Sequence, residues 1–201
     1  MKMLLVIVVT SILIITVGYS KSTNNKTENI ATNQTDSVTF HLSGQTYSYG
    51  PMLDSTTCHA YGDCVCCTGK YLFLNEKDFL TIIKICEPWG DSYSKGTFQI
   101  ENGNIILHYD SLGVNDENTS LAGNDTSSTL NPKYVLRQTK TPAYTTKLIY
   151  VGWNNNTAFK TTDEEAFFVT LDKDYRMSDL INRLKADSVW DKLEMQNIIL
   201  K

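Results

Sequence analysis

The stretch Gly96–Tyr109 reads GTFQIENGNIILHY, and its pattern predicts a β-hairpin. Asn102 and Gly103 both tolerate the positive φ angle that a two-residue hairpin turn requires. Before the turn, Phe98 and Ile100 alternate with polar residues, and a similar alternation continues after it. We therefore expect two antiparallel strands joined at this turn, each with one apolar face.

Short aromatic and β-branched runs on both sides of the hairpin indicate further strands. The run FLTIIKIC at residues 79–86 is long enough for a central strand. The remaining strands are expected at residues 38–42, 46–49, 70–74, 134–138, 147–153 and 166–171. The fold class that follows is mainly β, with antiparallel strands arranged as a barrel or a sandwich.

Near the end of the chain the apolar residues recur with a helical period, which predicts one C-terminal α-helix from Ser178 to Met195. Ser178 is a suitable N-cap residue. Leu180, Ile181 and Leu184 would then share one helix face. We expect this apolar face to pack on the sheet.

The first 20 residues have the three parts of a secretory signal peptide. Lys2 provides a positive start, an apolar run of about 15 residues follows, and small residues precede a cleavage site after Ser20. Such a run is short for a membrane span, which needs about 20 residues. We therefore expect a secreted or periplasmic protein with no stable membrane span after cleavage.

Polar stretches divide the rest of the chain. Residues 21–36 are polar and aperiodic, which is typical of a flexible tail before a folded domain. A second polar stretch predicts a surface loop at 111–131 within a single β-rich domain that spans 37–201. The formal net charge of −4 gives no reason to expect a nucleic-acid partner.

Residues 70–110 resemble a segment of secreted proteins of the Bacteroidetes type. A strand reading KYLFLNEKDF is followed by a cysteine-bearing strand and then by the hairpin described above. Such segments are similar to pieces of lipocalin-like or META-like antiparallel barrels, and distantly to the NlpE-type copper-stress envelope proteins. This chain departs from the NlpE-type pattern, because it has no lipid-anchor cysteine and its cysteines are spaced C-x5-C-x-C-C. The resemblance implies a lipocalin-like barrel.

Five cysteines carry the most distinctive chemistry of the sequence: Cys58, Cys64, Cys66, Cys67 and Cys86. Outside the cytoplasm cysteines usually form disulfides, but five cannot all pair within one chain. A bond between the neighbours Cys66 and Cys67 would be strained. We expect structural disulfides, with Cys86 bridged to one of the other four, because that bond would attach a polar loop to an apolar strand.

A soft-metal site is the alternative interpretation of the same loop. Cys58, His59, Cys64, Cys66 and Cys67 lie within ten residues. Thiolate and imidazole groups suit Zn²⁺ or Cu⁺, although the usual zinc spacing is absent. The expectation is therefore no cofactor, with copper or zinc as the alternative.

No catalytic motif supports an enzyme, because the sequence has no G-x-S-x-G, no H-E-x-x-H and no phosphate-binding loop. We expect a non-catalytic binding module for a small ligand or an envelope partner. The alternative is a metal- or redox-responsive envelope protein acting through the Cys58–Cys67 loop. The aromatic residues are expected mainly in the core. The other arrangement is a barrel mouth for an apolar or sugar ligand, lined by Tyr47, Tyr49, Trp89 and Tyr93.

Replacing Cys86 with serine tests the expected disulfide. Loss of a native bridge should lower the free energy of unfolding by about 2–5 kcal/mol and leave one additional reactive thiol. Thermal unfolding and thiol titration of the native protein measure these two effects. An unchanged melting temperature and thiol count would contradict the bridge, whereas loss of stoichiometric Cu⁺ or Zn²⁺ binding would favour the metal site.

Overall fold

The predicted hairpin is present in the structure of the chain, a computed structural model. Strands β6 (Gly90–Glu101) and β7 (Asn104–Asn118) are antiparallel partners joined by a two-residue turn. In this turn Asn102 has a φ angle of 49° and Gly103 a φ angle of 75°. The prediction of the hairpin and of its turn is confirmed.

The structure describes most of a compact unit formed by residues 36–201. The described ranges are 40–63, 68–85, 90–118, 134–153, 156–162 and 167–201. The expected signal peptide and polar tail lie outside them. Within these ranges no helix has both the length and the apolar character needed to cross a membrane.

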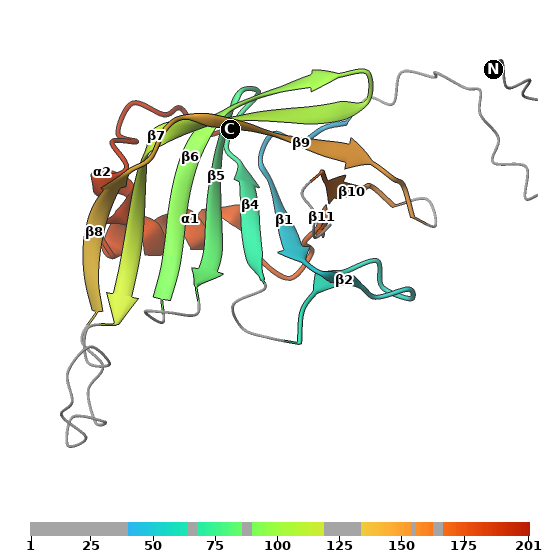
Figure 1. Ribbon diagram of the computed structural model, residues 1–201, viewed down its shortest axis with the longest axis horizontal. Coiled ribbons are helices and arrows are strands. Elements are labelled where there is room, and N and C mark those ends of the chain that lie inside the picture. Colours follow the sequence, from blue (N-terminus) through green and yellow to red (C-terminus); the bar gives the residue numbers. More distant parts are fainter. Residues whose placement is uncertain (1–39, 64–67, 86–89, 119–133, 154–155, 163–166) are drawn as a thin grey trace, which may run out of the picture. The chain divides into compact units, whose positions relative to one another are not determined.

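Eight antiparallel strands close into a barrel (Figure 1). Around the ring they are β1 (Gln45–Gly50), β4 (Gly69–Phe73), β5 (Asp78–Ile85), β6, β7, β9 (Tyr144–Tyr150), β10 (Ala158–Thr161) and β11 (Phe168–Leu171). Strand β11 pairs with β1 and completes the ring. The predicted fold class, a mainly β antiparallel barrel with a C-terminal helix, is confirmed.

Strand β7 pairs with two different neighbours along its length. Its first half pairs with β9, and its second half pairs with β8 (Tyr134–Lys140). Between the two halves the register against β6 shifts, opposite Ser94 and Gly96. At this bulge the backbone N–H of Thr141 donates to the carbonyl oxygen of Ser111 at 2.9 Å. The hydrogen bond attaches the β8–β9 turn at the point where β7 changes partner.

The predicted surface loop at 111–131 is wrong in its first part, because residues 111–118 belong to β7. The side chain of Val114 is fully buried, while its neighbours Asn115 and Asp116 are polar. A strand with few apolar side chains resembles a loop in composition, and only its pairing with β6 and β8 identifies it. The remainder of the expected loop lies outside the described residues.

Other differences concern short segments. Strands β2 (Met52–Leu53), β3 (Ala60–Tyr61) and β10 are too short to show an alternating pattern. In the strand expected at 38–42, the described residues 40–42 are not β structure. Phe40 and Leu42 instead pack into the barrel core.

Two apolar layers hold the fold together. The barrel interior contains Phe73, Phe79 and Phe159, each with a fully buried side chain. The second layer lies on the outer face of the same strands, where Leu72 and Leu80 pack against the C-terminal segment. Burial of this much apolar surface on both faces of β4 and β5 is the main stabilising contribution to the fold.

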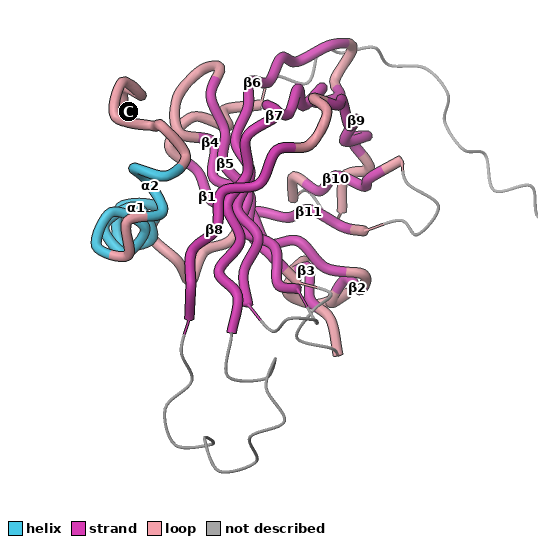
Figure 2. The backbone as a smooth tube through the Cα atoms, turned by 60° about the vertical axis from the view of Figure 1, so that its left-hand side comes forward, coloured by secondary structure: helices cyan, strands magenta, loops and turns pink. Residues whose placement is uncertain are grey.

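The C-terminal segment forms α1 (Met177–Ala186) and α2 (Val189–Lys192), which are separated by Ser188 at a φ angle of 62°. The single helix predicted from Ser178 to Met195 is therefore wrong in its second half, because the left-handed backbone at Ser188 interrupts it. Figure 2 shows both helices on one side of strands β4–β8, with β9–β11 on the other side. The expected packing on the sheet is confirmed by the buried side chains of Ile181 and Leu184.

The predicted N-cap at Ser178 is wrong. The N-cap is Arg176, whose side chain makes no capping hydrogen bond. The preceding turn explains this, because the Asp172 carboxylate accepts hydrogen bonds from the backbone N–H groups of Asp174 and Tyr175. That turn aligns the chain so that helical structure begins before Ser178.

Replacing Gly103 with valine tests the hairpin. The space around a Cβ atom at this position is open, so the cost comes from the positive φ angle and not from a clash. We expect the free energy of unfolding to fall by about 1–2 kcal/mol, measured by urea denaturation. The control is Asn102→Gly, which keeps a residue suited to positive φ and should change stability much less. Equal losses in the two variants would contradict the explanation.

Candidate functional site

Four tyrosines from different strands, and one phenylalanine directly before β11, meet on the inner face of the barrel. We call this set the aromatic cluster; its members are Tyr49, Tyr71, Tyr109, Tyr144 and Phe167. Alternation within each strand directs these tyrosines inward: Tyr71 shares a face with Phe73 of β4, and Tyr109 shares one with Leu107 of β7.

The rings of the aromatic cluster form two parallel stacks. Tyr109 and Tyr144 stack with ring centroids 4.4 Å apart and an interplanar angle of 7°. Tyr49 and Phe167 stack in the same way at 4.7 Å and 7°. Tyr71 connects the two stacks, because its ring lies 5.8 Å from that of Tyr49 and its hydroxyl accepts a hydrogen bond from the Tyr109 hydroxyl at 3.4 Å.

The aromatic cluster extends from the core to the solvent. Tyr71 is 4% exposed and Tyr109 is 7% exposed, whereas Tyr144 is 51% exposed. Burial raises the pKa of the Tyr109 phenol well above its ordinary value, and the neighbouring Tyr71 and Tyr144 hydroxyls raise it further. The Tyr109 phenol therefore remains neutral over the physiological pH range and keeps its hydrogen-bonding proton.

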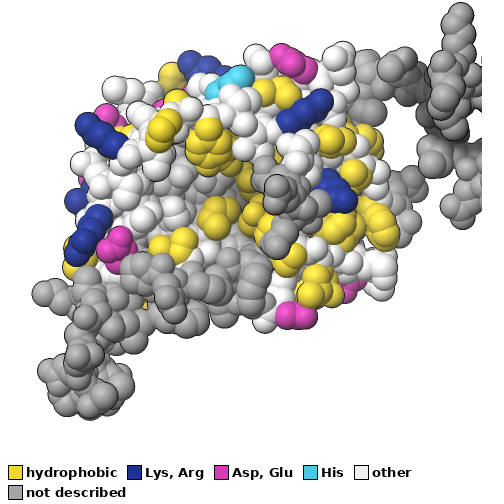
Figure 3. Space-filling model, viewed as in Figure 1, with side chains coloured by type: hydrophobic (Ala, Val, Ile, Leu, Met, Phe, Trp, Pro, Cys, Tyr) yellow, Lys and Arg dark blue, Asp and Glu magenta, His cyan; other side chains and the backbone are white. Residues whose placement is uncertain are grey.

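Figure 3 shows hydrophobic side chains gathered on the face of the molecule that this view presents. Within the aromatic cluster, Tyr144 is the exposed member, at 51%. Stacked rings with neutral hydroxyls can bind a flat apolar ring through their faces and a sugar ring through both faces and hydroxyls.

Sequence reasoning identified one of these residues. Of the four candidates for a barrel mouth, Tyr49 belongs to the aromatic cluster, and Tyr47 is buried in the core. Tyr93 lies on the outer face of the barrel beneath the helices, and Trp89 lies outside the described residues. The alternation in KYLFL could have indicated Tyr71, but the position of Tyr144 depends on its pairing with Tyr109 across β9 and β7.

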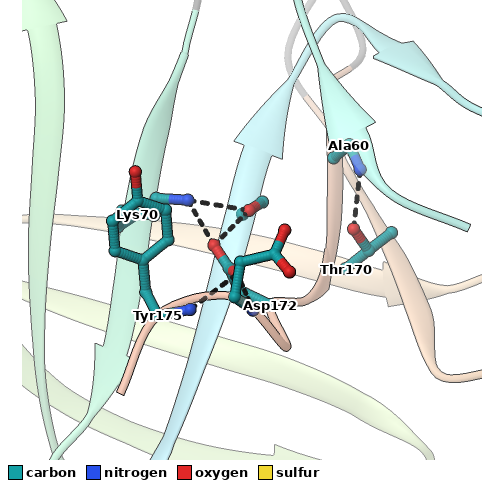
Figure 4. A network of polar contacts seen from close by, with 7 residues as sticks. Ala60, Lys70, Thr170, Asp172 and Tyr175 are labelled. Atoms are coloured by element: carbon teal, nitrogen blue, oxygen red, sulfur yellow. Dashed lines mark hydrogen bonds and ion pairs between the residues drawn. The ribbon is translucent and has the colours of Figure 1, made fainter. Parts of the chain in front are cut away.

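A polar network lies on the outer face of the barrel (Figure 4). The Asp172 carboxylate forms an ion pair with Lys70 and accepts a hydrogen bond from the Ser48 hydroxyl at 2.7 Å. The Lys70 ammonium also lies 4.3 Å from the centre of the Tyr175 ring. Burial alone would raise the pKa of Asp172, but the hydrogen bonds and the Lys70 charge outweigh it and lower that pKa below its usual value.

The cysteine region is described only at its start. Asp54 accepts hydrogen bonds from the backbone N–H groups of Thr56 and Thr57, and this turn leads to Cys58 at a φ angle of 56°. Cys58 is a buried free thiol, and burial raises its pKa, although the Lys173 charge opposes the shift.

Cys58 and His59 line a cavity of about 510 Å³ together with Leu171 and Lys173. Cys64, Cys66, Cys67 and Cys86 lie outside the described residues, so the expected disulfide stays a prediction. Within the described ranges no three His, Cys, Asp or Glu side chains group closely enough to hold a metal ion.

The comparisons with known proteins agree with the fold. No family model matches the chain, and neither does any curated protein sequence. Among solved structures, the chain is similar to a streptavidin-like protein from Bacteroides eggerthii, with a TM-score of 0.50 and 12% sequence identity. The match covers 77% of this chain and 97% of that protein. At this identity the likeness shows the barrel fold alone.

Replacing Asp172 with asparagine tests the polar network. The variant leaves the mostly buried Lys70 charge unpaired, so we expect the free energy of unfolding at neutral pH to fall by about 3 kcal/mol. Because folding lowers the pKa of Asp172, its stabilisation is present above the unfolded-state pKa of about 3.9 and is lost as the pH falls through the folded-state pKa. The difference between wild type and variant should therefore shrink in acid.

Glu76→Gln is the matched control for this experiment. It breaks an ion pair with Lys201 in which both side chains are largely exposed, so stability should change little at any pH. Urea denaturation at several pH values measures both variants. A loss of stability with Asp172→Asn that did not diminish in acid would contradict the explanation.

Proposed function

We propose that the protein is a secreted or envelope binding module that holds a small ligand with an apolar or sugar ring against the aromatic cluster. The observation that carries this proposal is the continuous stack from buried Tyr109 to half-exposed Tyr144. A barrel provides a rigid framework for such a surface, because each of the four tyrosines belongs to a different paired strand.

The exposed part of the aromatic cluster favours binding of a ligand that contains a ring. The exposed face of Tyr144 offers an apolar surface that water covers poorly, and a ligand ring that displaces this water gains hydrophobic and dispersion energy. Beneath this surface the Tyr109 hydroxyl donates a hydrogen bond to the Tyr71 hydroxyl, which connects the buried rings of the aromatic cluster. Such a site selects a ligand mainly by the shape of its ring.

Binding suits this arrangement better than catalysis. The aromatic cluster contains no carboxylate, imidazole or thiol, and burial raises the pKa of the Tyr109 phenol, so that this hydroxyl stays neutral and is a poor nucleophile. The secreted or envelope location rests on the apolar run after Lys2. The same module could present its surface to an envelope protein, which is the other partner we expect.

Tyr144→Ala tests the proposed binding surface. Saturation-transfer NMR with indole and methyl β-glucoside, a planar apolar ring and a sugar ring, should show binding of at least one probe to the wild-type protein. The variant should lose that signal, because it removes the exposed half of the Tyr109–Tyr144 stack. Tyr134→Ala is the matched control, since Tyr134 is equally accessible at 53% exposed but lies on β8 outside the aromatic cluster.

Two results would contradict the proposal. One is that neither probe binds the wild-type protein at millimolar concentration. The other is that Tyr134→Ala reduces the signal as much as Tyr144→Ala, which would indicate adsorption to any exposed tyrosine.

A metal- or redox-responsive role is the second candidate. It is favoured by the position of Cys58 and His59 on one cavity, where a thiol and an imidazole reach the same space. The raised pKa of Cys58 disfavours the thiolate that soft metals bind, which is why this candidate ranks second. The other three expected ligands lie outside the described residues. Metal stoichiometry of the wild-type protein, measured after incubation with Cu⁺ or Zn²⁺, decides the question.

A further inference from the structure

Helix α1 is attached to the barrel less firmly than the part of the C-terminal segment that follows it. Only Ile181 and Leu184 of its ten residues are buried. The four residues of α2 bury Val189 and Trp190, and Leu193 directly after it has no exposed surface. A helix that buries few apolar side chains separates from its support at a low cost in free energy. We therefore expect α1 to move more easily than α2.

A cavity and a bend mark the boundaries of α1. The cavity, of about 180 Å³, lies between α1 and the outer face of β4–β6. Its apolar wall includes Leu180 and Leu184 of the helix and Ile82 of β5. At the far end of α1 the left-handed backbone of Ser188 separates it from α2, so the two helices are not one rigid rod. A tilt about Ser188 would lift α1 from the sheet and leave α2 in place.

Carboxylates gather at this boundary between helix and sheet. Asp91 of β6 and Asp116 of β7 are direct cross-strand partners. They lie on the outer face of the barrel, because they alternate with Tyr93 and Val114, which pack beneath the helices. Asp187 follows directly after α1 and brings a third carboxylate from the helix side. Like charges at opposed positions of paired strands repel each other.

Positive charges compensate these carboxylates only in part. The ammonium of Lys84 on β5 forms an ion pair with Asp91, with 2.6 Å between Nζ and Oδ1. Arg183 of α1 lies 4.0 Å from Asp187, but both side chains are largely exposed, so this pair contributes little. Lys70 also lines the cavity, and it is already held in the polar network of Figure 4.

Asp116 is the carboxylate that this arrangement leaves without a close cation. Burial raises its pKa above the usual value, Asp91 and Asp187 raise it further, and the charge of Lys84 opposes the shift. The residue opposite Asp116 on β8 is uncharged. Tyr93 stays neutral, because burial raises its pKa as well.

The direction of this shift fixes how the contact responds to pH. A carboxyl group whose pKa is raised by folding binds its proton more tightly in the folded than in the unfolded chain. The stabilisation that follows is fully present below the unfolded-state pKa of about 3.9, and it is lost as the pH rises through the folded-state pKa. The repulsion at Asp116 is therefore small in acid and largest at neutral pH.

We propose that α1 is a pH-sensitive cover over this cavity, docked firmly in mild acid and loosened at neutral pH. Protonation of Asp116 removes one of three like charges, so the repulsion between the sheet and Asp187 falls. At neutral pH the repulsion returns and α1 opens more often, while α2 keeps the rest of the outer face covered. This device goes beyond the proposed function, because it involves neither the aromatic cluster nor its ligand.

Hydrogen–deuterium exchange of the protein at several pH values tests the proposal. Each amide rate is divided by its intrinsic rate at the same pH, which gives a protection factor for α1. We expect this protection to rise about threefold between neutral pH and about pH 4, the size of one relieved like-charge contact on a sheet. The amides of β5 are the internal reference and should not follow this change.

Three variants identify the group responsible. Asp116→Asn cannot ionise, so α1 should be as protected at neutral pH as in the wild type in acid. Asp187→Asn removes the charge on the helix side and should reduce the pH dependence. Asp110→Asn is the matched control, because it removes an exposed carboxylate of the same strand, paired with Lys95, outside this group. Its α1 should keep the wild-type pH dependence.

The proposal is overturned if the protection of α1 in the wild type does not rise in acid, or if Asp116→Asn keeps the wild-type pH dependence. An equal effect of Asp110→Asn would also overturn it, because the general surface charge would then explain the response. A parallel change in the β5 amides would do the same, since it would indicate global unfolding instead of a movement of α1.

Discussion

Strands β4 and β5 carry apolar side chains on both of their faces, and the rest of the structure depends on covering both. On the inner face, Phe73 and Phe79 are fully buried by the closed barrel. On the outer face, Leu72 and Leu80 are equally buried, but here the cover is the C-terminal segment. A barrel without that segment would expose one of its two apolar layers to water, which costs more free energy than a small domain can lose.

The change of partner along β7 is what gives the barrel its aromatic surface. Strand β9 leaves β7 at the pair Tyr109 and Tyr144, and β8 continues along the rest of β7. Tyr144 therefore stands at the end of its strand and remains half exposed, while its stacking partner is buried. If β9 paired with β7 along its whole length, additional paired residues would cover the position of Tyr144.

Asp172 links the barrel to the helical cover. Its carboxylate forms an ion pair with Lys70 and accepts a hydrogen bond from Ser48, both on barrel strands. It also accepts hydrogen bonds from the backbone N–H groups of the turn that leads into α1. This one buried group therefore sets the place where α1 begins. The helix consequently starts at Met177 with an N-cap that makes no side-chain hydrogen bond. The aromatic cluster and the start of α1 are thus consequences of two different constraints, one of strand pairing and one of charge.

Much of the fold can be predicted from the sequence, because its signals are local. The Asn102-Gly103 turn, the alternation around it and the period of the last helix each depend on residues a few positions apart. The candidate sites depend on contacts between distant residues. Tyr109 meets Tyr144 through strand register, and Asp172 reaches Lys70 across about 100 positions of chain. The free energy of the whole barrel determines the strand register and the long-range pairing, so no local pattern of residues predicts them.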